Sequence, residues 1–295
     1  MDGLASIVIR TYNEERYLPE LLSAIAEQST DGLDVEIVIV DSGSTDRTLD
    51  IVSGRVDKVV HIAKEDFSFG RSLNLGCQAA SGTFLVFTSA HCVPASKHWL
   101  AELVRPLAEN IASYSYGRQL GGPESKFSEG QLLLKYFPEV SQVPQEGFFC
   151  NNANAALRRE LWERFPFDEA LTGLEDMHLG KSLLENGHRL AYVAEAPVYH
   201  YHHESWSQVK RRYEREAIAL QRIMPEVQVG FRDFLRYVMS AILLDSGAAL
   251  QQKRLLEVFP EIVFFRLMQY WGTYRGNQDH RKLSRTRKER YYYPI

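Results

Sequence analysis

The chain is poor in cysteine and has none of the cysteine spacings typical of a structural role. Only Cys77, Cys92 and Cys150 occur among its 295 residues, far apart and without a CxxC pair. An odd number of widely spaced cysteines disfavours both a disulfide framework and a structural zinc knuckle. The pattern favours a protein of a reducing compartment.

Long apolar runs are also missing. The most apolar stretches, YVMSAILL from Tyr237 and EIVFFRLM from Glu261, are far shorter than the roughly 18 to 20 residues that cross a bilayer. The N-terminal MDGLASIVIR leads directly into a strand-like segment and lacks the basic and apolar regions of a signal peptide. We therefore expect no membrane-spanning helix, no export and a cytoplasmic location.

The chain has no excess of positive charge. It carries 34 basic and 38 acidic residues, for a formal net charge of −4, so we expect no nucleic-acid partner. With 45% apolar and 24% charged residues its composition is that of an ordinary globular protein, which excludes disordered and collagen-like classes. The length suits one large domain, or one domain with an appendage.

Residues 5–86 alternate short β-branched runs with segments of helical spacing, a pattern that predicts an α/β fold with a parallel sheet and crossover helices. The expected strands are SIVI, EIVIVD, VVHI and TFLVF. From Tyr17 onward apolar residues repeat at helical spacing, which predicts a helix with Asn13 as its N-cap and Pro19 in its first turn.

The character of the chain changes after Ser205, where helix formers dominate and a break is expected at Pro225. We predict a main domain over residues 1–225 and a C-terminal helical region over residues 226–295. Charge is polarised toward the end of the chain. Residues 275–295 carry seven basic and two acidic residues, a net charge of +5, whereas the rest of the chain totals −9.

Ligands of a parallel α/β sheet bind beyond the carboxyl ends of its strands, so the residues just after each apolar run are informative. These residues read TYNEE (11–15), DSGSTD (41–46) and SAHCVP (89–94). None matches GxGxxG or GxxxxGK(S/T), which argues against a dinucleotide fingerprint or a Walker loop. They supply an aromatic ring, carboxylates and hydrogen-bond donors, a set that suits a nucleoside.

The order of these motifs carries a family resemblance. A strand followed by TYNEE, then IVIVDSGSTDRT, then FSFGRSLNLGCQAASGTFLVF and a short loop ending in proline resembles a family 2 glycosyltransferase with the GT-A fold. The resemblance resumes at NNANAALRRELWERFPFDE and GLEDMHLGKSLLENGHRLAYV, which are similar to bacterial rhamnosyltransferase-like enzymes of surface polysaccharide biosynthesis. It covers residues 5–205. It implies a Rossmann-like, mixed and mostly parallel sheet with helices on both faces.

The resemblance also implies an activity. The chain would move a sugar, with inversion, from a nucleotide-diphosphate sugar to a hydroxyl of a glycan or lipid-linked acceptor. Glu175 and Asp176 would form the catalytic centre, with Asp176 as the base, at the start of a helix that ends at Gly187. The alternative is that acidic residues there serve only the helix dipole.

Several residues would bind the donor. Asp41 would read the base of the nucleotide and Arg71 would face its pyrophosphate, although Arg71 can also be a solvated residue at a helix start. The whole set implied by the resemblance is Thr11, Tyr12, Asn13, Glu14, Asp41, Arg71 and Ser89. Taken singly, TYNEE and DSGSTD are also compatible with turn and cap chemistry alone.

One departure from the family concerns the metal. Where the family places a DxD-type acidic motif, this chain has Ser89, Ala90 and His91. His91 can still bind Mn²⁺ or Mg²⁺, and an imidazole ligand favours Mn²⁺. In the alternative the metal is dispensable, because Arg71 and helix dipoles carry the diphosphate charge.

Further polar clusters suggest additional ligands. In YHYHHES, His200 and His202 share a face if the segment is extended, and the resemblance implies that a histidine here reaches the metal or diphosphate; a structural histidine is the alternative. In the loop after Cys150, amides can grip sugar hydroxyls of the acceptor or simply form a tight turn. The predicted acceptor-binding residues are Asn151, Asn152 and Asn154.

Two other functions compete with this one. The missing acidic motif would suit a non-catalytic module that binds a nucleotide-sugar or a glycan, although such a module needs no base at Asp176. A nucleotidyltransferase would also bind nucleotides on an α/β sheet. That class is expected to carry a Gly-rich phosphate loop with a basic residue, and TYNEE provides neither.

The C-terminal region from Phe231 onward interleaves apolar, aromatic and basic residues and carries three consecutive tyrosines, Tyr291, Tyr292 and Tyr293, near its end. We expect this helical region to meet the cytoplasmic face of a membrane, which would make the protein peripheral. The alternative is that the same apolar residues pack on the main domain or form a homodimer.

Overall fold

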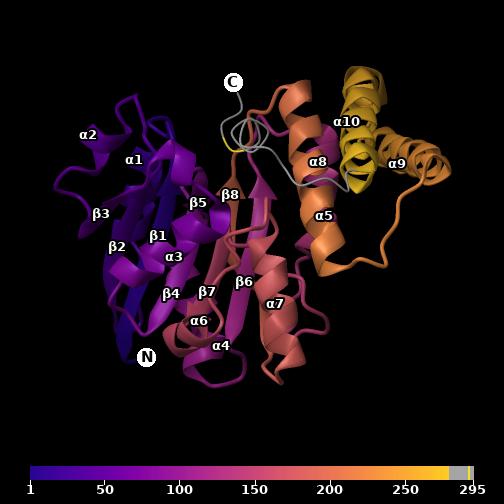
Figure 1. The fold of residues 1–295 in the computed structure, drawn as a ribbon. Helices are drawn as coiled ribbons and strands as arrows, with labels where there is room; N and C mark the ends of the chain where they lie inside the picture. The colour runs from indigo at the N-terminus through magenta and orange to yellow at the C-terminus, as the bar shows by residue number, and fades with distance from the viewer. Residues whose placement is uncertain (279–291, 293–295) are drawn as a thin grey trace. The chain divides into compact units, whose positions relative to one another are not determined.

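The computed structural model describes residues 1–278 and residue 292, and these residues form two compact units (Figure 1). The sheet unit comprises Met1–Gly122, Phe137–Leu171 and Glu175–Tyr201. The helical unit comprises Pro123–Tyr136, Thr172–Leu174 and the described residues from His202 onward. The predicted boundary between a catalytic domain over residues 1–225 and a helical region over residues 226–295 stays a prediction. The basic tail from residue 279 lies outside the described residues, apart from residue 292.

Within the described chain, the sheet unit forms one eight-stranded sheet with the order β3-β2-β1-β4-β7-β6-β8-β5. Four of the seven pairings in this described sheet are parallel and three are antiparallel, so the predicted mixed α/β fold is confirmed. The strands are β1 (Gly3–Thr11), β2 (Leu33–Asp41), β3 (Lys58–His61), β4 (Phe84–Ser89), β5 (Cys92–Pro94), β6 (Tyr114–Gly121), β7 (Asn154–Arg158) and β8 (Leu190–His200).

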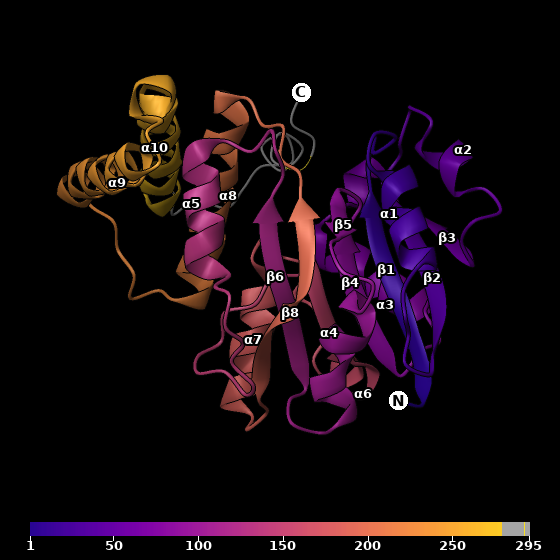
Figure 2. The same cartoon turned by 180° about the vertical axis from the view of Figure 1, so that it is seen from behind.

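Helices cover both faces of this sheet, as predicted (Figure 1; the reverse side is shown in Figure 2). Ile7 and Ile9 of β1 belong to the core under α1 and α4, whereas Val8 points to the opposite face under α3. Alternate side chains of β1 are therefore buried on both sides, which explains its continuous apolar sequence. The helices are α1 (Leu18–Ala26), α2 (Thr48–Val52), η1 (Lys64–Asp66), α3 (Phe69–Ala79), α4 (Trp99–Ala108), α6 (Arg159–Arg164) and α7 (Glu175–Glu185).

The predicted N-cap of the first helix is wrong. Helix α1 begins at Leu18 with Tyr17 at the N-cap position, and Pro19 lies in the first turn as expected. Asn13 instead adopts a left-handed backbone conformation, with φ of 56°, and its Oδ1 accepts a hydrogen bond from the Thr45 backbone N–H at 2.8 Å. The side chain is thus used to join two loops and is not available to cap the helix.

The helical unit contains α5 (Phe127–Tyr136), α8 (Trp206–Ile223), α9 (Phe231–Gln251) and α10 (Leu255–Asn277). The break expected at Pro225 is confirmed, since it lies between α8 and α9. Helix α8 starts with a capping box in which Ser205 and Gln208 exchange hydrogen bonds. Among the described residues, no helix is both long enough and apolar enough to cross a membrane.

A buried ion pair joins α9 to α10. The Arg266 guanidinium donates to both carboxylate oxygens of Asp245, at 2.7 and 2.8 Å, and to Gln269 Oε1 at 2.8 Å. Asp245 also accepts a hydrogen bond from the Ser128 hydroxyl of α5. Both charges are nearly fully buried, so this pair is satisfied by its partners and not by water.

Close packing of α3 on the sheet yields a stability prediction. A Cβ at Gly76 would collide with Val8 Cγ1 and lie 3.0 Å from Val40 Cγ2. We expect Gly76→Ala to destabilise the protein by about 1 to 3 kcal/mol through overpacking. In thermal unfolding, Gly130→Ala in α5, whose Cβ would meet no atom within 4 Å, should instead be stabilising by about 0.5 to 1 kcal/mol. Equal effects of the two substitutions would contradict this packing.

Candidate functional site

The direction of the strands brings the candidate residues to one edge of the sheet. Strands β1, β2 and β4 are parallel, and β6 and β8 run the same way because β7 is antiparallel to both β4 and β6. Thr11, Asp41, Ser89 and His200 are therefore the last residues of strands that end at the same edge. Asn154, which starts β7, pairs with Thr88 and lies at this edge as well.

Hydrogen bonds join the TYNEE and DSGSTD loops along this edge. The Asn13 backbone N–H donates to Ser44 Oγ at 2.9 Å, and the Asn13 side chain accepts from Thr45. The Glu14 backbone N–H donates to Thr48 Oγ1 at 2.8 Å. The two loops are therefore held together as one polar region at the end of the sheet.

Asp41 is buried beneath this polar region and accepts hydrogen bonds from it. It is 1% exposed, and its Oδ2 accepts the backbone N–H groups of Gly43 and Ser44 at 3.0 and 3.1 Å. Its Oδ1 accepts from the hydroxyls of Ser44 and Thr11, at 2.5 and 3.2 Å. Most of its acceptor capacity is thus used by the loop. Its predicted reading of a nucleotide base stays a prediction.

Tyr12 has a basic neighbour that the sequence analysis missed. Lys64 Nζ donates to the Tyr12 hydroxyl at 2.9 Å and lies 4.7 Å from the centre of its ring. The two are 52 residues apart in the chain. The pair places a positive charge beside an aromatic face, a combination that suits a nucleoside and its phosphates.

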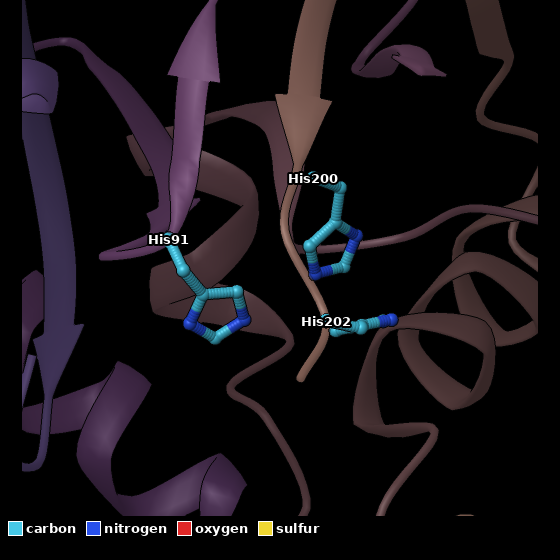
Figure 3. A group of neighbouring side chains, drawn as sticks. All are labelled: His91, His200 and His202. Carbon is cyan, nitrogen blue, oxygen red and sulfur yellow. The ribbon is translucent and has the colours of Figure 1, made fainter. Parts of the chain in front are cut away.

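A line of polar contacts crosses the edge through two histidines. His91 Nδ1 lies 2.8 Å from Glu14 Oε1, and the His91 ring stacks on His200 with centroids 5.2 Å apart and an interplanar angle of 19°. His200 Nδ1 lies 2.7 Å from Gln119 Oε1, and Gln119 Nε2 donates to Asn151 Oδ1 at 3.0 Å. Figure 3 shows the two rings on neighbouring segments of the sheet unit.

These contacts fit a divalent cation. Metal-binding histidines generally donate the other ring N–H to a carboxylate or carbonyl oxygen, which fixes the tautomer. Glu14 and Gln119 are partners of that kind for His91 and His200. With the proton on Nδ1, the lone pair of each imidazole lies on Nε2, the atom that would ligate a metal.

His202, also drawn in Figure 3, is the first residue of the last segment of the helical unit. There its Nδ1 lies 2.7 Å from Glu129 Oε1, which also accepts from Arg212 at 2.9 Å. Burial alone would raise the pKa of Glu129, but the hydrogen bond and charge of His202, with Arg212 and Lys126, lower it to about 2. A metal-binding role for His202 stays a prediction.

Asp176 is a buried carboxylate at the start of α7. Its Oδ2 accepts the Asn152 backbone N–H at 2.9 Å and its Oδ1 accepts the Met177 N–H at 2.7 Å. Burial, reinforced by the charge of Glu175, raises its pKa from the usual 3.8 to about 7, against the opposing effects of these N–H donors and Arg10. A carboxyl group with this pKa can exchange a proton near neutral pH.

Arg10 links this helix start to the end of β1, and the sequence analysis missed it. Its Nη1 lies 3.4 Å from Glu175 Oε1, across 165 residues of chain, and its guanidinium lies 5.2 Å from the centre of the Phe69 ring. The available signal was a charged residue inside the apolar run IVIRT. A charge within a buried strand requires a partner, although the sequence does not name it.

The helix itself has the predicted extent. Helix α7 runs over Glu175–Glu185, and Gly187 follows with φ of 81°. The Gly187 and His188 N–H groups return to Leu184 and Leu183 carbonyls. Gly187 thus ends the helix in the left-handed conformation that glycine favours, as predicted.

The three asparagines have different surroundings. Asn154 is 0% exposed. Its Oδ1 accepts a hydrogen bond from Trp99 Nε1, and its Nδ2 donates to the carbonyl oxygens of Arg118 and Ala196. Its polar atoms are therefore used within the core, so Asn154 is not included in the proposed acceptor site. Asn152 accepts the Tyr114 hydroxyl, while its buried Nδ2 has no hydrogen-bond partner among the described residues.

Arg71 lies in the first turn of α3, whose N-cap is Ser68. Its Nη1 is 3.8 Å from Glu169 Oε2, and the side chain is 45% exposed. Helix N-termini favour phosphate, so the position is compatible with the predicted role. Ser89 lies in register with Arg10 on the neighbouring strand. The roles predicted for both residues stay predictions.

Comparisons with known proteins bear on this site. The family model described as Glycosyl transferase family 2 matches residues 6–165, more than half of the chain. The chain is 25% identical over 287 residues to the O-antigen chain rhamnosyltransferase RfbN of Salmonella typhimurium, covering 90% of each. It is 27% identical over 256 residues to the O-antigen chain rhamnosyltransferase WbaN of Salmonella anatum, covering 80% of each.

One solved structure supports the fold. The mannosyltransferase PcManGT from Pyrobaculum calidifontis, in complex with GDP-Man and Mn²⁺, matches with a TM-score of 0.67 and 19% identity, covering 95% of this chain and 89% of that one. The predicted GT-A fold is confirmed.

The pKa of Asp176 predicts a pH dependence of stability. Between the usual pKa and about 7, the folded protein holds a proton on Asp176 that the unfolded chain has lost. The free energy of unfolding therefore falls as pH rises through this window. We therefore compare the melting temperature of Asp176→Asn with that of wild type at each pH. The melting temperature of the variant minus that of wild type should be larger at pH 8 than at pH 5. Asp34→Asn, at an exposed position of β2, is the control and should show no such change with pH. If the difference between Asp176→Asn and wild type is the same at both pH values, the prediction is wrong.

Proposed function

Because the chain belongs to glycosyltransferase family 2, we propose that it transfers a sugar, with inversion, from a nucleotide-diphosphate sugar to an acceptor hydroxyl. The acceptor is a glycan or a lipid-linked glycan of a bacterial surface polysaccharide. Similarity to two O-antigen chain rhamnosyltransferases supports a deoxyhexose, or else a hexose, as the transferred sugar. One observation carries the proposal: a buried carboxyl group with a pKa near 7, Asp176, at the helix start that Arg10 ties to the end of β1.

Asp176 acts as the general base. Near pH 7 a large share of this carboxyl group is ionised, so it can accept the acceptor hydroxyl proton as that oxygen attacks the anomeric carbon. The nucleotide departs from the opposite side in a single in-line displacement, and inversion follows. Glu175 raises the pKa of Asp176 and Arg10 opposes it, so both residues adjust the strength of the base.

The donor binds along the joined loops. The Tyr12 ring and the adjoining polar atoms of Thr11, Asn13 and Asp41 hold the nucleoside, and Ser89 contacts the donor at the end of β4. Arg71, at the start of α3, faces the pyrophosphate together with the helix N-terminus. Asn151 and Asn152 bind hydroxyls of the acceptor.

His91 and His200 hold a divalent cation, with His202 retained as a predicted third ligand. The supporting observation is that Glu14 and Gln119 occupy the Nδ1 side of the first two rings. When bound, the cation neutralises charge on the departing diphosphate. Imidazole ligands favour Mn²⁺ over Mg²⁺.

Replacement of the base tests the reaction. Asp176→Asn should lower turnover by about 10² to 10⁴-fold, the usual contribution of a general base, and leave donor affinity within about twofold. Transfer from a panel of nucleotide-sugars and donor binding by calorimetry measure the two effects, with Asp34→Asn as the control. If the turnover of Asp176→Asn exceeds a tenth of the wild-type turnover, Asp176 is not the base. Donor binding without transfer by the wild type would favour the binding module.

Metal removal tests the histidines. Turnover should be lost in EDTA and return with Mn²⁺ more fully than with Mg²⁺. His91→Ala should raise the dissociation constant for Mn²⁺, measured directly by calorimetry, by at least about tenfold, whereas His98→Ala, at an exposed position before α4, should not change it. Full turnover after exhaustive chelation would instead support neutralisation of the diphosphate by Arg71.

A further inference from the structure

The helical unit exposes a stripe of large apolar side chains. On α9, Leu235, Met239 and Leu243 recur every four residues, and Leu250 follows seven residues later, so they lie on one side of the helix. Leu243 is 68% exposed and Leu250 is 64% exposed. Leu256, in the first turn of α10, is 97% exposed. We call these five residues the outer stripe.

The outer stripe is separate from the side of α9 that packs within the unit. Phe234, Val238, Ala241 and Ala249 are all buried, and they repeat at helical spacing on the inner side. One apolar side suffices for a helix that packs on one partner surface. The outer stripe is therefore not needed to fold this unit, and a row of large apolar side chains left exposed in this way is typical of an interaction site.

The charges around the outer stripe are asymmetric. Arg232 is exposed at the start of α9. The nearby acidic groups are held by partners, since Asp233 accepts from Arg236 at 3.0 Å and Glu257 accepts from Arg254 at 2.8 Å. Residues 231–278, the described part of this region, carry six basic and four acidic residues, a net charge of +2.

This asymmetry distinguishes two occupants. A second copy of the chain would bring an equally positive region against the first, so charge would oppose the contact. An anionic bilayer attracts basic segments and accepts leucine and methionine into the boundary between headgroups and acyl chains. Arginine side chains can extend beside such a stripe and keep their charge among the headgroups.

We propose that the outer stripe on α9 and α10 binds the surface of an anionic lipid bilayer, with α9 lying in the plane of the interface. The binding needs no membrane-spanning helix, in agreement with the described helices. It also does not depend on which sugar the enzyme transfers, because lipid binding and sugar transfer are separate measurements.

Vesicle flotation with the full chain tests the proposal. We expect wild type to float with vesicles of phosphatidylcholine containing 30% phosphatidylglycerol in low salt, and to bind at least about tenfold more weakly to phosphatidylcholine alone or in 0.5 M salt. The triple substitution Leu243→Gln, Leu250→Gln and Leu256→Gln should weaken binding at least about tenfold. All three side chains are exposed, so the variant should keep the circular dichroism and melting temperature of wild type.

A matched control alters exposed apolar residues elsewhere. Val140→Gln with Leu184→Gln, at positions 74% and 40% exposed in the sheet unit, should float as wild type does. A full chain that ignores anionic vesicles, or a triple variant that binds them as well as wild type, would overturn the proposal. Light scattering can show a different outcome, in which wild type is a dimer that does not bind vesicles and the triple variant is a monomer. That outcome would identify a second copy of the chain as the occupant. Unchanged transfer to a soluble acceptor by the triple variant separates these outcomes from the test of sugar transfer.

Discussion

The site depends on one constraint, the common direction of the strands that carry its residues. Because β1, β2, β4, β6 and β8 end at the same edge, residues more than a hundred positions apart in the chain meet there. The ion pair between Arg10 and Glu175 uses this arrangement: the first strand ends where α7 begins, so the buried carboxylate of Asp176 and the donor loops share an edge. Each chemical role proposed for the sheet unit follows from this juxtaposition.

The histidines depend on their neighbours as much as on their own position. Glu14 belongs to the TYNEE loop, and its Oε1 contacts His91 Nδ1, so the loop proposed to bind the donor also fixes the orientation of an imidazole. Gln119 is held in turn by Asn151, which lies in the loop proposed to bind the acceptor. The loops proposed to bind the donor and the acceptor are therefore connected through the two histidines, by contacts of Glu14, Gln119 and Asn151 and by stacking of the His91 and His200 rings. A change in one of these loops should alter the others.

The sequence was sufficient for the local features. Periodicity located the early strands, and Gly187 marked the end of α7 because glycine adopts the left-handed conformation that ends many helices. The long-range partners were out of reach, because Arg10, Lys64 and Gln119 acquire their roles from contacts across 52 to 165 residues. Local spacing holds no information about such pairs. Asn13 failed as an N-cap for the same reason, since a distant loop competes for its side chain.

The buried ion pair of α9 and α10 has a consequence for the surface of these helices. Apolar contacts between two helices tolerate sliding, whereas the two-pronged contact between Arg266 and Asp245 is satisfied in only one register. A slip by one helical turn, about 5.4 Å, would leave two opposite charges buried and unpaired. The exposed leucines of α9 therefore keep a fixed position along the helices relative to the exposed Leu256 of α10. Two buried charges in the helical unit thus determine the alignment of the outer stripe.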